Sequence, residues 1–208
     1  MKSSLFLFSI LLYLLNSVEL SDYTNEELNA CKTAENIKYL NQTEKDVLFY
    51  MNLVRINPNK FSKKILEPYI SKNPNYSKKY YKSLLKDLNK GISSQPLLPS
   101  KELFNFSKKH AKTTGKKGKI GHRSVKGKSF TYRTKNLIKK YNLVGENIHY
   151  GSNNAIEIVI DLLIDDGIKD VGHRLNILNE TYVFSSVSIQ HHKTHKYNCV
   201  INFAGRKI

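Results

Sequence analysis

The sequence of 208 residues contains only two cysteines, Cys31 and Cys199. This number excludes the dense disulfide framework on which many small secreted domains depend. Stability must therefore come from a hydrophobic core, and the chain is long enough for one domain of ~100–200 residues. In an oxidising compartment the two cysteines could pair and join the N-terminal segment to the last strand, but their spacing does not decide whether they do.

Long apolar runs are absent after the first twenty residues. An apolar run over residues 5–15 follows a basic start and precedes small and polar residues, which is the pattern of a secretory signal. The run is too short to span a bilayer, which requires ~20 apolar residues. We therefore predict a signal peptide at residues 1–20, a polar arm at 21–40 and a single domain at 41–208. The protein is expected to be secreted and extracellular, and an uncleaved signal anchor is the alternative.

Acidic residues are absent from a basic segment, residues 108–140, which contains thirteen Lys or Arg. The formal net charge of the whole chain is +17. One interpretation is a solvated face that keeps the protein soluble. The other is a basic face that attracts a polyanion, such as phospholipid head groups at a membrane surface or an acidic glycan. Nucleic acid is not an expected partner, because the segment contains no recognisable nucleic-acid-binding motif and the chain is predicted to be secreted.

Apolar spacing predicts helices through most of the chain. The first should begin at Asn41 or Thr43, both of which are good N-caps. Apolar residues then follow at helical spacing: Val47, Leu48, Met51 and Val54. Further helices are predicted over residues 59–70, 76–91, 98–115 and 153–165, with a short one from Gly172. Glycines are expected to end three of them, at Gly91, at Gly115 with Gly118, and at Gly167.

Two strand patterns close the chain, over residues 182–190 and 198–204, and the turn between them predicts a hairpin. Residues 143–151, "LVGENIHYG", are too few for a full helix and indicate a strand or an ordered loop. Because helices come first and strands last, this order predicts an α+β layered fold rather than a repeating βαβ sheet.

Linear metal-binding motifs are absent, since the sequence contains neither His-x-x-x-His nor His-Glu-x-x-His. The candidate residues are instead scattered: His122 in "IGHRS", Glu146 in "GENI" and His173 in "GHR". Two imidazoles with one or two carboxylates would suit Zn²⁺ if the fold brought them together. No glycine elbow surrounds Ser124, and neither cysteine lies in a thiolate motif. We therefore assign no catalytic residue.

Five segments occur in a characteristic order: "MNLVRINPNKF", "GHRSVKGKSFTYR", "GENIHYG", "LLIDDGIKDVGHRLNIL" and "CVINFA". Over about residues 44–205 this order resembles the CAP superfamily, the SCP-like proteins related to cysteine-rich secretory proteins, antigen 5 and pathogenesis-related 1. The chain is similar to the short bacterial and protist form, because it lacks the Gly-His-Phe-Thr segment, the tryptophans and the cysteine-rich tail of animal and plant members. The resemblance implies a three-layer α-β-α sandwich with a central cleft.

In that family two histidines and two acids line the cleft, and some members bind a divalent metal there. The resemblance places His122, Glu146 and His173 at three of the four positions. The remaining acid is normally a glutamate in the helix before Gly-His; here Asp165 is the best candidate, followed by Asp166 and Asp161. The implied metal ligands are His122, His173 and Glu146, and the metal would be Zn²⁺ or Mg²⁺.

Each candidate also has a purely structural interpretation. His122 and His173 could hydrogen-bond the carboxylates and join the layers, and Glu146 could pair with a neighbouring lysine. His110 lies on the apolar face of its predicted helix and is expected to be a core histidine. Arg174 is expected to be a capping or surface residue. Three histidines of the hairpin turn are expected to be solvated: His191, His192 and His195.

These observations favour a secreted, non-enzymatic binding protein over an enzyme. Its ligand would be a lipid, a sterol or a surface polyanion such as an acidic glycan, bound through the cleft and the basic face. The alternative is a metal-dependent hydrolase that uses the same cleft, with His122 and His173 holding an activated water and Glu146 acting as the base. The sequence does not define the oligomeric state.

Overall fold

The computed structural model describes residues 20–208, so the predicted signal peptide lies outside the described residues except for Leu20. The helices are α2 (Asn25–Cys31), α3 (Gln42–Ile56), α4 (Pro58–Phe61), the π-helical turn η1 (Ser62–Leu66), α5 (Glu67–Lys72), α6 (Lys78–Leu88), α7 (Lys101–Lys117), α8 (Phe130–Arg133), α9 (Lys135–Ile138), α10 (Ala155–Ile164) and α11 (Gly172–Leu178). The strands are β1 (Leu98–Pro99), β2 (Val144–Tyr150), β3 (Phe184–His192) and β4 (Lys196–Ala204). Across residues 20–208, the model contains no helix with the length and apolar character needed to cross a membrane.

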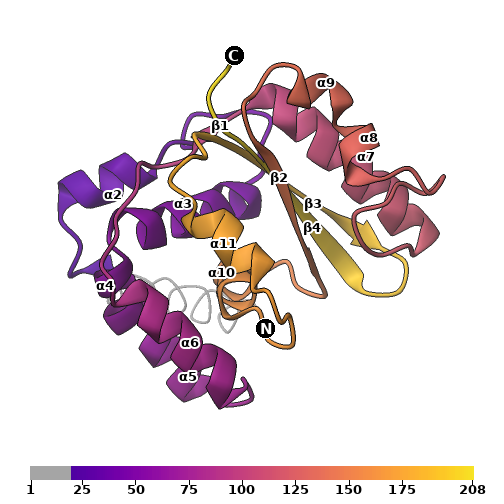
Figure 1. Cartoon of the computed structure of the whole chain (residues 1–208). Coiled ribbons are helices and arrows are strands. Elements are labelled where there is room, and N and C mark those ends of the chain that lie inside the picture. The colour runs from indigo at the N-terminus through magenta and orange to yellow at the C-terminus, as the bar shows by residue number, and fades with distance from the viewer. Residues whose placement is uncertain (1–19) are drawn as a thin grey trace, which may run out of the picture.

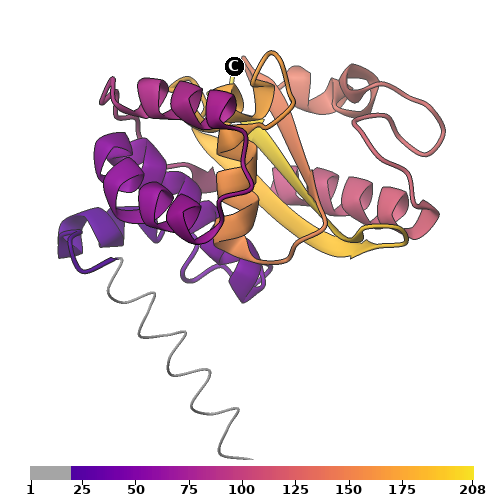
Figure 2. The same cartoon turned by 90° about the horizontal axis from the view of Figure 1, so that it is seen from below.

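The strands form one sheet in the order β1-β3-β4-β2. β1 runs parallel to β3, whereas β3 and β2 are both antiparallel to β4. Helix α7 packs on one face of the sheet against β3 and β4, while α3, α10 and α11 lie on the other face (Figure 1 and Figure 2). The molecule is thus an α-β-α sandwich, and the predicted α+β class with three layers is confirmed.

The main hydrophobic core lies between the sheet and the layer that contains α3 and α10. Helix α3 begins after Asn41, whose side chain accepts from the N–H of Glu44 while the Glu44 carboxylate accepts from the N–H of Asn41. This capping box satisfies two backbone donors at the point where the apolar stripe begins. The stripe is buried with residues of α10 and of the central strands: Val47, Leu48, Met51, Val54, Ile158, Val159, Leu163, Val187 and Ile201. Burial of each such side chain stabilises the fold by about 1.5–3 kcal/mol.

The interface between α7 and the sheet is more polar. Oγ of Ser107 in α7 lies 2.6 Å from Oγ of Ser186 in β3 and donates to Oδ1 of Asn202 in β4 (2.9 Å). The side-chain amide of Asn198 in β4 donates to the carbonyl oxygen of Ala111 (3.1 Å). Because these buried bonds are directional, they fix the position of α7 along the strands as well as its distance from them.

Gly115 lies inside α7, and the prediction that it breaks this helix was wrong, because the helix continues to Lys117. A Cβ atom at position 115 would overlap the carbonyl oxygen of His191 in β3. The residue is therefore a glycine because the hairpin approaches the helix closely at this point. The helix ends at Gly118, whose φ of +63° is the left-handed conformation that commonly ends a helix.

Residues 21–40, which were predicted to be a polar arm, pack into the folded domain. Helix α2 begins with a capping box between Thr24 and Glu27. The segment also contributes four buried apolar side chains: Tyr23, Cys31, Ala34 and Leu40. Cys31 and Cys199 are both buried free thiols, and burial raises the pKa of Cys31 to about 12.

Two fully buried arginines position helix α11. Nη1 of Arg55 in α3 donates to the carbonyl oxygen of Ile177 at the end of α11 (2.7 Å). Arg174 in α11 donates from Nε to the carbonyl oxygen of Leu163 in α10 (2.7 Å) and from Nη1 to the Asp87 carboxylate in α6 (3.0 Å). The prediction that Arg174 is a capping or surface residue was wrong, because its guanidinium joins three helices in the interior.

Candidate functional site

Helix α10 ends because Asp165 adopts a left-handed conformation with φ of +59°, two residues before the predicted end at Gly167. Aspartate adopts this conformation more readily than most residues. The buried carboxylate of Asp165 accepts from the backbone N–H of His173 (2.8 Å) and from Nδ1 of the same residue (2.6 Å). One side chain thus ends the helix and also fixes the histidine ring.

The two alternative acids lie elsewhere. Asp161 pairs with Nε2 of His149 (2.7 Å), a contact that the sequence did not indicate. Asp166 accepts from a backbone N–H just before α6 (2.8 Å). Of the three aspartates considered from the sequence, Asp165 is the one that contacts His173.

Glu146 lies in β2, and its side chain is only 1% exposed. Arg133 at the end of α8 donates to both carboxylate oxygens, from Nη1 to Oε1 (2.9 Å) and from Nη2 to Oε2 (2.7 Å). Nδ1 of His122 donates to Oε1 (2.9 Å), and Asn202 in β4 donates to Oε2 (3.1 Å). The ionic partner of Glu146 is therefore an arginine rather than one of the lysines considered in the sequence.

Arg133 also supports the histidine directly, since its Nη1 donates to the carbonyl oxygen of His122 (2.8 Å). Its guanidinium is partly buried, and this burial lowers the pKa of Arg133, while the charge of Glu146 acts in the opposite direction. A planar guanidinium presents two parallel donors to a carboxylate, which gives this pair a defined geometry. Sequence reasoning missed Arg133, because one arginine among the thirteen cations of residues 108–140 has no distinguishing pattern.

Together these residues surround a hollow of about 480 Å³, which we call the cleft. Its lining consists of His122, Glu146, Ile168, Asp170, Gly172, His173, Leu175 and Asn176. The structure thus places three of the four predicted residues around one hollow, and Asp165 lies behind His173 without lining it. The side chain of His122 is 47% exposed and that of His173 is 23% exposed, so a ligand can reach both rings.

Each imidazole of the cleft is paired through Nδ1 with a carboxylate. In the neutral ring this arrangement places the hydrogen on Nδ1 and leaves the lone pair on Nε2. Within residues 20–208, neither Nε2 atom takes part in a hydrogen bond. With both rings neutral, the cleft offers two acceptor atoms, from His122 and His173, to a hydroxyl or amine group of a ligand or to a metal ion.

The predicted three-ligand metal set does not fit this arrangement. Both oxygen atoms of Glu146 are already bonded to Arg133. Among the residues that the structure describes, no group of three or more His, Cys, Asp or Glu side chains is placed so that it could hold a metal ion. Binding of Zn²⁺ or Mg²⁺ remains a prediction, and Nε2 of His122 and Nε2 of His173 are the donors that it would use.

Two asparagines fix the backbone on the His173 side of the cleft. Nδ2 of Asn147 in β2 donates to the carbonyl oxygen of His173 (2.9 Å). Nδ2 of Asn176 in α11 donates in turn to Oδ1 of Asn147 (2.8 Å). The start of α11 is therefore joined to β2, the strand that carries Glu146. This connection positions the His173–Asp165 pair relative to the His122–Glu146 pair.

The other histidines lie outside the cleft. His110 is buried and hydrogen-bonds the carbonyl oxygen of Gly121 through Nε2 (3.0 Å), as expected for a core histidine, and burial lowers the pKa of His110. His192 is also buried and contacts the carbonyl oxygen of Lys119 (3.1 Å), so the prediction of a solvated side chain was wrong for this residue. Both His191 and His192 lie in β3, where successive side chains point to opposite faces, so His192 is buried while its neighbour His191 is exposed. His195 in the turn is exposed as predicted.

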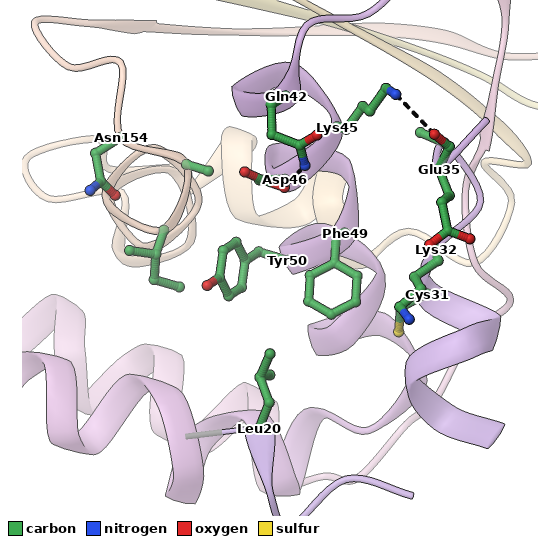
Figure 3. A pocket seen from close by; sticks show the side chains of 13 residues that line it. Leu20, Cys31, Lys32, Glu35, Gln42, Lys45, Asp46, Phe49, Tyr50 and Asn154 are labelled. Atoms are coloured by element: carbon green, nitrogen blue, oxygen red, sulfur yellow. Dashed lines mark hydrogen bonds between the residues drawn. The ribbon is translucent and has the colours of Figure 1, made fainter. Parts of the chain in front are cut away.

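A second hollow of about 910 Å³ lies beside α3, away from both histidines of the cleft. Figure 3 shows Phe49 and Tyr50 of α3 side by side in this hollow, with Leu20 opposite. Its polar part includes Asp46, which accepts from Gln42 (2.7 Å). Burial raises the pKa of Asp46. No sequence pattern predicted this hollow, because its lining comes from separate segments of the chain.

The model of the cysteine-rich secretory protein family, CAP, matches residues 90–203, which is more than half of the chain. An extracellular protein containing an SCP domain from Bacillus anthracis is 19% identical, with a TM-score of 0.42; the match covers 54% of this chain and 35% of that protein. An outer surface protein from Borrelia burgdorferi is also 19% identical, with a TM-score of 0.46; the match covers 62% of this chain and 95% of that protein. No curated protein matches the sequence significantly.

Proposed function

Because this chain belongs to the CAP family of cysteine-rich secretory proteins, we propose that it is a secreted, non-enzymatic binding protein. The cleft would take the polar end of a lipid or sterol, and the basic face of residues 108–140 would attract an anionic surface such as phospholipid head groups or acidic glycans.

The observation that carries the proposal is the chemistry of the cleft. It offers two imidazole Nε2 acceptors, and its lining includes no serine, threonine, cysteine or lysine among the described residues. Two of the lining side chains are exposed and apolar, Ile168 (41%) and Leu175 (57%). A ligand with a hydroxyl group on an apolar body, such as a sterol, matches this combination, and the volume falls within the ~300–1,000 Å³ of typical ligand sites.

The alternative function is a metal-dependent hydrolase with Glu146 as the base. A general base must be free to accept a proton from the attacking water. In this structure both oxygens of Glu146 are bonded to Arg133, and the carboxylate is almost completely buried. This arrangement favours a structural role for Glu146, which is why we place binding before hydrolysis.

Equilibrium titration of the purified protein with a fluorescent sterol, and with vesicles that contain unlabelled sterol as competitor, tests the proposal. We expect saturable binding that weakens about fivefold to tenfold in His173→Gln, since one hydrogen bond to the ligand contributes about 1 kcal/mol. His195→Gln, which changes an exposed histidine outside the cleft, is the matched control and should bind as the unchanged protein does.

Two results would contradict the proposal. The first is the absence of saturable binding to sterols, lipid vesicles and acidic glycans at modest salt. The second is turnover of an ester or peptide that a chelator abolishes and that is lost in both His122→Gln and His173→Gln, which would establish the hydrolase alternative.

A further inference from the structure

The charge of the protein is separated along the chain. Residues 103–145 and 181–208 contain 17 of the 34 Lys and Arg residues and none of the 17 Asp and Glu residues. The rest of the chain has 17 of each and is formally neutral. The whole net charge of +17 therefore belongs to these two stretches, which we call the acid-free segments.

The fold brings the acid-free segments together. They form α7 from Leu103 onwards, the loop from Gly118 to Ser129, α8, α9, and the hairpin of β3 and β4. The hairpin turn contacts the end of α7, where the N–H of Lys193 donates to the carbonyl oxygen of Gly115 (3.0 Å). Figure 1 and Figure 2 both show the end of α7, the following loop and the hairpin turn at the same end of the molecule. The separation in sequence is thus also a separation in space.

Most cations of this end have no acidic partner. Of the thirteen Lys and Arg residues between 108 and 140, only Arg133 and Lys140 form ion pairs with residues in the described range. The others include the exposed lysines of the loop, Lys119, Lys126 and Lys128. A cationic surface of this kind, with no internal neutralisation, attracts an anionic surface over a distance of about one Debye length.

Apolar side chains are exposed within the same loop. Ile120 is 64% exposed and Val125 is 37% exposed, and Tyr132 just beyond the loop is 53% exposed. The loop is held in place although these side chains are exposed, because both backbone groups of Gly121, the residue after Ile120, form hydrogen bonds. The N–H of Gly121 donates to Oη of Tyr150 (2.8 Å), and its carbonyl oxygen contacts Nε2 of His110 (3.0 Å).

We propose that this loop is a membrane-docking element that inserts Ile120 and Val125 into the interface of an anionic phospholipid bilayer, with the surrounding lysines on the head groups. The combination of cations with exposed apolar side chains is what favours a lipid surface over an acidic glycan, which offers no apolar phase. The inference deepens the proposed anionic-surface binding and does not depend on the ligand of the cleft.

Docking in this orientation has a consequence for the cleft. His122 lies two residues after Ile120 and lines the cleft, and the exposed Ile168 and Leu175 line the same cleft. Insertion of Ile120 would therefore bring the cleft to the bilayer surface, so that a lipid could pass between membrane and cleft over a short distance.

The sequence contains no tryptophan, which allows a direct test. Ile120→Trp introduces a single tryptophan at the proposed insertion point, and its emission is distinguished from that of the thirteen tyrosines by selective excitation. Ile92→Trp is the matched control, because Ile92 is equally exposed (67% against 64%) but lies between α6 and β1, outside the acid-free segments. Each variant is mixed with vesicles of phosphatidylcholine alone or of phosphatidylcholine with phosphatidylserine at 7:3, and its emission is recorded at low and high salt, with folding verified by circular dichroism.

We expect a blue shift for Ile120→Trp with the anionic vesicles only, reversed by salt, and no shift for Ile92→Trp. Vesicle binding is also measured by co-sedimentation for a triple variant that combines Lys119→Gln, Lys126→Gln and Lys128→Gln. We expect it to bind anionic vesicles more weakly, by about fivefold for each lysine. A control variant that removes three charges from α6, at Lys78, Lys79 and Lys82, should bind as the unchanged protein does. A shift that is equal in both tryptophan variants, or absent in both, overturns the inference. Binding to heparin without binding to anionic vesicles overturns it too, but leaves the proposed attraction to polyanions intact.

Discussion

Arg133 and Glu146 form a mostly buried ion pair whose removal should have a large effect. The side chains are 11% and 1% exposed, and the guanidinium donates to both carboxylate oxygens. Arg133→Met would leave the charge of Glu146 in the interior with only His122 and Asn202 as partners. Removing one partner of a buried pair costs about 3–5 kcal/mol. For a domain of this size, with about 2–4 °C per kcal/mol, the melting temperature should fall by roughly 6–20 °C.

Urea and thermal unfolding followed by circular dichroism at neutral pH would measure this effect. Lys140→Met is the matched control, because Lys140 pairs with Glu102 at the surface (57% and 34% exposed) and such pairs contribute about 1 kcal/mol or less. The double variant Arg133→Met with Glu146→Gln should recover much of the lost stability, since no unpaired charge remains. If Arg133→Met is no more destabilising than Lys140→Met, the pair is effectively solvated and our account of the site is incorrect.

Three further predictions concern the packing of the fold. Gly115→Ala should lower the free energy of unfolding by about 1–3 kcal/mol, because its Cβ overlaps the facing hairpin; an unchanged urea midpoint would contradict the close approach. Burial lowers the pKa of His110, so its contribution to stability is present above pH ~6.5 and is lost as the pH falls towards the folded-state pKa; urea titrations at several pH values should show a shallower decline in His110→Gln, and an identical decline would contradict this. Burial raises the pKa of both Cys31 and Cys199, so iodoacetamide at pH 8 should label neither thiol in the native protein and both in urea; one or no label in urea would contradict two free thiols.

Local signals in the sequence were sufficient for most of the helices and strands. Asn41, one of the two N-caps considered for the first helix, caps it in the structure. Alternation of apolar residues predicted the hairpin. The structure moves the first strand two residues later, to Phe184–His192, and begins the second two residues earlier, at Lys196. Features of this kind depend on neighbours a few residues apart, which a sequence pattern contains.

Features that depend on distant partners could not be predicted in the same way. Gly115 was interpreted as a helix end because the facing carbonyl of His191 comes from a strand more than seventy residues later. Arg174 was interpreted as a surface residue because its partners lie in two other helices. Arg133 was not singled out at all, although it contacts Glu146 thirteen residues later, since one arginine among many cations has no distinguishing pattern.

The scattered histidines illustrate both cases. The ordered segments of the resemblance placed His122 and His173 near one cleft, and the structure brings them to it. Their pairing through Nδ1, which determines what the cleft can bind, depends on side-chain geometry and on the conformation of Asp165. Residue order therefore located the site, and only the coordinates defined its chemistry.

Position 165 restricts how this protein can vary. A glycine there would accept the backbone conformation but remove the partner of His173, while a glutamate would keep the charge and strain the backbone. Asparagine would accept the conformation and lose the anion. Among the twenty amino acids, aspartate alone meets both demands. The end of α10 and the acceptor atom of the His173 ring therefore cannot change independently. Substitutions at position 165 should accumulate far more slowly than at the exposed positions that follow it.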